Sequence, residues 1–162
     1  WARKLNAVYP TVAEEWSLFA ADDLRFHPGW ADEVARVGER TNCCVVGTND
    51  LHNVRVKAGR HSTHPAVNRG YKECGGVIDD PTRMLFEGYG HWWTDDEFVQ
   101  TAMWRRTWAF AKAAHVEHLH PEYGDAEWDD TYLRGRATMW DDQAVYASRK
   151  HLWGRWSVRR TA

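Results

Sequence analysis

The sequence lacks features that would each point to a class of protein. No apolar run approaches the roughly 20 residues that cross a bilayer, so we predict no transmembrane segment. Lysine and arginine (21) nearly balance aspartate and glutamate (23), so no basic field indicates nucleic-acid binding. The cysteines, Cys43, Cys44 and Cys74, have neither a disulfide framework nor the paired spacing of structural zinc. This pattern favours a reducing, cytoplasmic setting.

Tryptophan, in contrast, is abundant. The chain has 11 tryptophans in 162 residues, and their flat rings serve equally in a core or as platforms for sugars. Both uses stay open for the four in its last part, Trp128, Trp140, Trp153 and Trp156. The length predicts a single domain over residues 1–162, with its motifs at about 5–120 and a helical segment at about 125–158.

Hydrophobic patterning predicts an α/β chain. We expect strands over residues 15–21, 43–48, 65–71 and 116–120, and helices over residues 30–40, 69–73, 95–114 and 129–156. Residues 50–60 alternate weakly at Val54 and Val56, which indicates a short hairpin or edge segment. Thr94 is predicted to cap the helix that starts at Asp95.

An acid pair, Asp22 and Asp23, follows the first predicted strand. The end of a strand is where an α/β sheet presents ligands, and carboxylate oxygens suit Mg²⁺ or Mn²⁺ holding a diphosphate. The same two residues are also typical of a turn, so the pair alone decides little.

A second acidic segment, Asp95, Asp96 and Glu97, lies in the first turn of the predicted helix. The helix dipole lowers the proton affinity of a carboxylate there, whereas burial beside Trp92 and Trp93 raises it. Asp95 is therefore a candidate general base, and ordinary helix capping is the alternative.

Histidines form two further candidate groups. His118 and His120 are two residues apart on a predicted strand, so both can face a metal ion, although the helical H-E-x-x-H arrangement of zinc hydrolases is missing. His61 and His64 lie in a donor-rich loop that suits either a phosphate, an acceptor hydroxyl or plain solvent exposure.

Four segments, in their order along the chain, resemble motifs of family-two glycosyltransferases, especially small phage-type members. The acid pair is followed by an F-x-P-G-W motif (residues 26–30), and residues 68–79 look like the family's acceptor-side segment with two adjacent glycines. Residues 94–98 are similar to its E-D-x-E-L motif, and residues 116–120 to its late strand that carries a metal-binding histidine. Ala21 and Thr94 replace the usual Asp and Glu.

The resemblance implies a GT-A-like (Rossmann-like) mixed sheet flanked by helices. The family's N-terminal nucleotide-binding strands have no counterpart before Trp1, so we expect the C-terminal, acceptor-side portion of that fold. The implied activity is transfer of a sugar, with inversion, from a nucleotide-diphosphate sugar donor to an unknown acceptor hydroxyl with Mn²⁺ or Mg²⁺. The location would be cytoplasmic, in the host if the gene belongs to a phage.

The resemblance also implies roles for single residues. Asp22, Asp23 and His118 would bind the metal ion, and Asp95 would be the catalytic base with Glu97 in support. Substrate-binding roles would fall to five residues, Asp22, His61, His64, Arg69 and Trp93. Two other classes remain open: a sugar-binding module without catalysis, and a metal-dependent hydrolase that uses His118 and His120.

Overall fold

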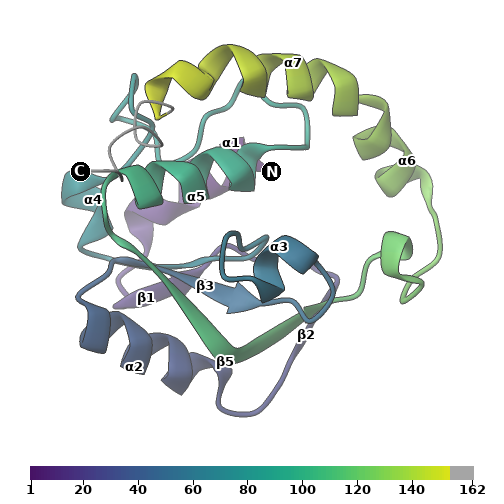
Figure 1. The fold of residues 1–162 in the computed structure, drawn as a ribbon. Coiled ribbons are helices and arrows are strands. Elements are labelled where there is room, and N and C mark those ends of the chain that lie inside the picture. The colour runs from purple at the N-terminus through teal and green to yellow at the C-terminus, as the bar shows by residue number, and fades with distance from the viewer. Residues whose placement is uncertain (154–162) are drawn as a thin grey trace, which may run out of the picture.

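The computed structural model of the chain describes residues 1–153 and folds them around a five-stranded mixed sheet (Figure 1). The strands lie in the order β1 (Trp16–Leu18), β4 (Ala66–Asn68), β3 (Val45–Asn49), β5 (Trp108–His118) and β2 (Leu24–Phe26). Strands β3 and β5 are parallel, and the other neighbouring pairs are antiparallel. The predicted α/β class with a mixed sheet is confirmed.

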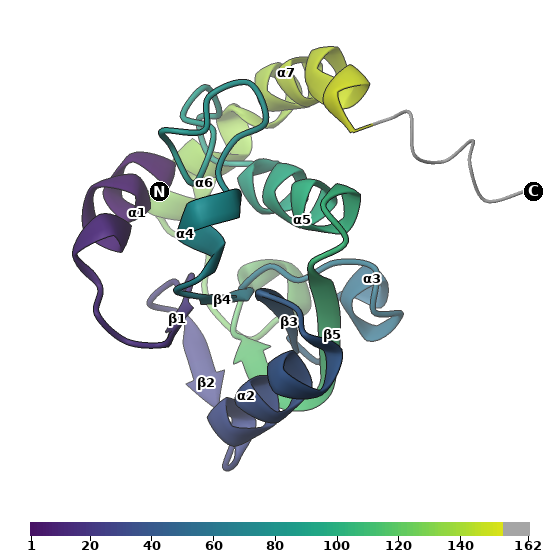
Figure 2. The same ribbon diagram turned by 90° about the vertical axis from the view of Figure 1, so that its left-hand side faces the viewer.

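Helices cover both faces of this sheet (Figure 2). They are α1 (Ala2–Val8), α2 (Trp30–Thr41), α3 (Val54–Lys57), α4 (Tyr71–Cys74), α5 (Thr94–Trp104), α6 (Asp130–Ala137) and α7 (Met139–Arg149), with short 3-10 helices η1 (Tyr9–Thr11), η2 (Pro121–Tyr123) and η3 (Lys150–Leu152). No described helix has both the length and the apolar character that crossing a membrane requires.

The alternation of side chains along β3 explains why helices pack on both faces of the sheet. Val45 packs into a cluster with Phe98 of α5, whereas Val46 packs on the opposite face with Val34 and Val37 of α2. Successive strand residues point to opposite faces, and each buried valine contributes roughly 1.5–3 kcal/mol. The predicted helix over residues 30–40 and the predicted strand over residues 43–48 are thus confirmed.

The predicted helix over residues 95–114 is wrong in its second half. Helix α5 ends at Trp104, where Arg106 adopts a left-handed conformation (φ 60°) and the Thr107 N–H bonds to the Ala102 carbonyl. This closure is a Schellman motif formed without glycine. The following alanine-rich residues then pair with β3 and form β5, because the open edge of the sheet overrides their helical propensity.

Other local predictions need correction. Residues 50–60 contain the short helix α3, whose first turn is capped by the Asn53 side chain, instead of a hairpin. Thr94 is the first residue of α5 and makes no cap hydrogen bond. The predicted helix over residues 129–156 is broken at Thr138 into α6 and α7, and its last three positions lie outside the described residues.

Candidate functional site

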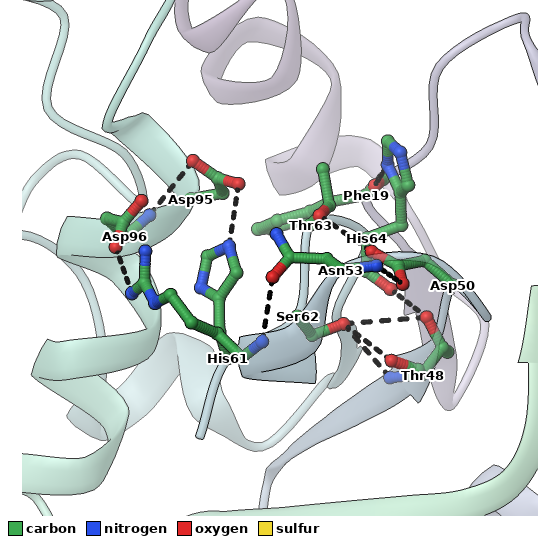
Figure 3. A network of polar contacts seen from close by, with 11 residues as sticks. Phe19, Thr48, Asp50, Asn53, His61, Ser62, Thr63, His64, Asp95 and Asp96 are labelled. Atoms are coloured by element: carbon green, nitrogen blue, oxygen red, sulfur yellow. Dashed lines mark hydrogen bonds and ion pairs between the residues drawn. The ribbon is translucent and has the colours of Figure 1, made fainter. Parts of the chain in front are cut away.

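The loop between α3 and β4 carries two buried histidines, His61 and His64. The loop is fixed to the end of β3 through Ser62, whose hydroxyl accepts the Thr48 N–H (3.0 Å) and bonds to the Thr48 carbonyl (3.1 Å). The Thr48 hydroxyl donates in turn to the His64 carbonyl (2.7 Å). Figure 3 shows this network, which fixes the backbone on both sides of Ser62.

Among the described residues, two groups of acids and histidines bring their ligand atoms within 4.8 Å of one another. The first group is Asp23, His64 and His118. Leu24 pairs with His118 between β2 and β5, so the register places Asp23 beside that histidine, with Oδ2 3.1 Å from Nε2. The His64 and His118 rings are perpendicular, with centroids 4.8 Å apart.

Two buried atoms of this first group fit a metal ion. The Nδ1 of His64 lies 3.1 Å from the Phe19 carbonyl, which only accepts, so Nδ1 carries the hydrogen and Nε2 carries the lone pair. Within residues 1–153, that Nε2 and Oδ1 of Asp23 have no hydrogen-bond partner. A carbonyl on the second ring nitrogen is the arrangement by which proteins orient metal-binding histidines.

The protonation states agree with this fit. Burial, followed by the charge of His118, lowers the pKa of His64 to about 4, so the imidazole is neutral at neutral pH. Burial opposes ionisation of Asp23, but the hydrogen bond to His118, the charge of His118 and the Tyr132 hydroxyl (2.9 Å) lower its pKa to about 2. Two imidazoles and one carboxylate suit zinc, manganese or iron better than Mg²⁺.

The second group is His61, Asp95 and Asp96. The Nε2 of His61 lies 3.2 Å from Oδ2 of Asp95, and Arg55 donates a hydrogen bond to Asp96. Because the arginine already brings positive charge to these acids, a cation would be repelled there. The first group is therefore the better candidate for a metal ion, and the second is a candidate for accepting and donating protons.

The two groups lie close together. His61 and His64 are three residues apart in one loop, so their Cα atoms are at most about 11 Å apart. The charge of Asp95 acts to raise the pKa of His64, and that of His64 acts to lower the pKa of Asp95. The predicted metal-binding acid and the predicted base thus lie on the same side of the molecule.

Other predicted site residues lie elsewhere. Asp22 is exposed and belongs to neither group. Arg69 follows β4, at the opposite end of the strand from His64, and donates to the Ala13 carbonyl (2.7 Å). Trp93 stacks on Tyr146 of α7, with ring centroids 4.9 Å apart.

The side chain of Glu97 points into the interior and forms two hydrogen bonds with Arg149 (both 2.8 Å) and one with the Tyr89 hydroxyl (2.8 Å). His120 lies beyond the end of β5, where its Nδ1 accepts the Glu122 N–H (3.2 Å). Its ring lies beside that of His118, with centroids 5.1 Å apart, but His120 is not one of the three residues whose ligand atoms converge.

Sequence reasoning named His64 only as a substrate-binding residue and did not name Tyr132. His64 lies two residues before β4, so, like Asp23 before β2, it is a candidate ligand from the end of a strand. That position was visible in the sequence, because the predicted strand began at Pro65. Tyr132, whose hydroxyl donates to Asp23 from α6, had no sequence pattern that marked it.

Comparisons with protein-family models, with curated proteins and with solved structures gave no match to this chain. The functional conclusion therefore rests on the geometry of the site and on the motif resemblance.

Proposed function

We propose that this chain carries the metal-binding and acceptor-activating residues of a glycosyltransferase that uses a nucleotide-diphosphate sugar. The observation that supports it best is the proximity of two unlike groups, Asp23–His64–His118 and His61–Asp95–Asp96, joined by one loop. Sugar transfer needs both a cation site for the diphosphate and a base for the acceptor. In this proposal the sheet is the acceptor-side portion of a GT-A-like fold.

The metal would be held by His64 through Nε2, by His118 and by Asp23. A bound divalent ion would act as a Lewis acid that neutralises charge on the departing diphosphate. Of the two ions expected, Mn²⁺ suits this site better than Mg²⁺, because two of the three ligands are imidazoles. Tyr132 keeps Asp23 in place by donating to Oδ2, and Oδ1, which has no hydrogen-bond partner among the described residues, would be free to bind the ion.

Asp95 would remove the acceptor proton. As the acceptor oxygen bonds to the anomeric carbon, its proton passes to the Asp95 carboxylate, and the bond between that carbon and the diphosphate oxygen breaks with its electron pair on the diphosphate. Attack from the face opposite the leaving group gives inversion. Asp95 can reach an acceptor because 21% of its side chain is exposed.

The test compares the Asp95→Asn variant with the wild type, both as full-length proteins. The substitution keeps the shape of the side chain and removes the base, so we expect a folded protein that binds Mn²⁺ normally and transfers sugar at least about 100-fold more slowly. A panel of UDP-, GDP- and dTDP-hexoses with Mn²⁺ supplies the donors, and release of nucleoside diphosphate is measured. Turnover by Asp95→Asn at the wild-type rate would contradict the role of Asp95.

A second candidate is a metal-dependent hydrolase. Two histidines and one carboxylate are also the protein ligands of catalytic zinc sites. In this function the histidine ligands would be His64 and His118, in place of the predicted pair His118 and His120. Stoichiometric zinc in the purified protein, together with zinc-dependent ester hydrolysis that no sugar nucleotide affects, would favour this function. Mn²⁺-dependent release of nucleoside diphosphate would favour sugar transfer.

A further inference from the structure

A buried histidine lies behind the candidate base. The side chain of His61 is 3% exposed, against 21% for Asp95, and their contact joins Nε2 to Oδ2 (Figure 3). A substrate hydroxyl can therefore approach Asp95 but not His61. The second nitrogen of this histidine, Nδ1, is buried and has no partner within residues 1–153. The polar contact of the His61 ring is thus with the Asp95 carboxylate.

The backbone next to His61 is held against the sheet. The neighbouring Ser62 bonds to the backbone of Thr48 through both its hydroxyl lone pair and its hydroxyl hydrogen. The other oxygen of Asp95, Oδ1, accepts the N–H of Asp96 in the same first turn (3.0 Å). The ion pair with His61 on Oδ2 and this hydrogen bond on Oδ1 together restrain the carboxylate.

The surroundings of Asp95 otherwise contain charges of both signs. Burial and the charge of Asp95 raise the pKa of Asp96, so the two adjacent acids disfavour each other's ionised form. The other titratable groups that interact with this pair are Arg55 on α3, His64 in the loop, His91 before α5, and Tyr123 and Tyr146. Among all of these, His61 is the cation that contacts Asp95 directly.

We propose that His61 is a positioning residue that keeps Asp95 ionised and holds its carboxylate toward the acceptor hydroxyl, an inference that rests on the proposed sugar transfer. During the reaction the acceptor proton moves to Asp95, and His61 keeps its own Nε2 hydrogen throughout. The histidine therefore neither gains nor loses a proton in the transfer step. It acts on the reaction only through Asp95.

The direction of both pKa shifts supports this pairing. Burial lowers the pKa of His61, but the hydrogen bond to Asp95 and the charge of Asp95 outweigh burial and raise it above its ordinary value. Burial raises the pKa of Asp95, but the hydrogen bond and charge of His61 outweigh it and lower the pKa.

The test is an NMR titration of the Asp95 carboxyl carbon in the full chain, which needs no substrate. In the wild type we expect a midpoint below the ordinary value of about 3.9. In His61→Gln, which keeps a donor but removes the charge, the midpoint should rise by roughly 1–3 units. The control is His151→Gln, an exposed histidine in η3, which should leave the midpoint unchanged. An unchanged midpoint in His61→Gln would overturn the proposal.

A reciprocal measurement covers the case in which His61→Gln does not fold. Asp95→Asn should lower the midpoint of the His61 ring, and an unchanged midpoint would also overturn the pairing. The activity readout is the acid limb of kcat/KM, which reports the essential base of the free enzyme and should move to higher pH in His61→Gln. If the wild type transfers sugar and the acid limb of kcat/KM does not move in His61→Gln, the role of His61 is refuted but the proposed function is not. Absence of any transfer by the wild type refutes the proposed function and leaves the titrations as the test of the pair.

Discussion

A histidine is ready to bind a metal ion when one ring nitrogen is held and the other is left with a free lone pair. His64 meets both conditions, because the Phe19 carbonyl holds Nδ1 and Nε2 has no partner among residues 1–153. His120 does not, because the Nδ1 lone pair accepts the Glu122 N–H and the ring packs edge-on against Tyr132, with centroids 4.9 Å apart. Identical side chains close together thus have different roles.

The difference predicts the effect of single alanine substitutions on metal binding. Loss of an outer-shell partner typically weakens binding by about 10–100-fold, and loss of a ligand weakens it further. We expect His64→Ala to weaken Mn²⁺ binding by more than about 100-fold and His120→Ala to leave it unchanged, as measured by isothermal titration with MnCl₂. Equal losses in the two variants would show that the ion is not held by the Asp23 group.

At the scale of elements, an ion-pair cluster joins α7 to α5 and to the loop that precedes it. Arg149 of α7 bonds to both oxygens of Glu97 on α5 and to both oxygens of Asp79 (2.9 and 2.7 Å). Glu97 is 5% exposed and Asp79 is 47% exposed, so the two acids differ in how much they depend on the arginine. This cluster holds the outer helix and makes Glu97 a structural residue.

The cluster predicts unequal stability losses. Arg149→Met leaves the Glu97 charge buried without its ion pair, which should lower the free energy of unfolding by about 3–5 kcal/mol. Asp79→Asn removes the exposed partner and should cost at most about 1 kcal/mol. Urea unfolding at neutral pH measures both. Equal and small losses of unfolding free energy in the two variants would mean that water solvates the Glu97 carboxylate when Arg149 is absent.

At the scale of the whole molecule, periodicity predicted the elements with strong local patterns and failed for β2 and for most of β5. The strand at residues 43–48 and the helix at residues 30–40 carry strong local patterns, and both form. Residues 108–114 suit a helix as well as a strand, and only the open edge of β3 decides between them. A local sequence pattern therefore predicts an element correctly unless pairing with a distant strand decides its structure.

The candidate site shows the same limit. Asp23, Asp95 and His118 come from segments that the motif resemblance had singled out, and the fold brings them to one side of the sheet. The role of His64 depends on the Phe19 carbonyl, a partner 45 positions away that no sequence spacing indicates. Predictions from sequence reached the acids, whereas the ring orientation needed tertiary structure.

The three candidate metal ligands also come from segments that are distant in sequence, which gives a prediction for the whole fold. Asp23 precedes β2, His64 precedes β4 and His118 ends β5. An ion held by all three would therefore link the segments before β2 and β4 to the end of the longest strand. A ligand that binds only the folded state at 100 times its Kd adds about 2.7 kcal/mol, or roughly 5–10 °C in Tm for a chain of this size.

We therefore expect Mn²⁺ to raise the Tm of the wild type by that amount and EDTA to reverse the rise, as followed by circular dichroism. Mg²⁺ at the same concentration should raise it less, because two of the three ligands are imidazoles, which Mg²⁺ binds poorly. His64→Ala should lose the response and His120→Ala should keep it. An equal rise in Tm in His64→Ala would show that Mn²⁺ stabilises the fold by binding elsewhere. The reason is that a site with three protein ligands should lose most of its affinity for the ion when one of them, His64, is removed.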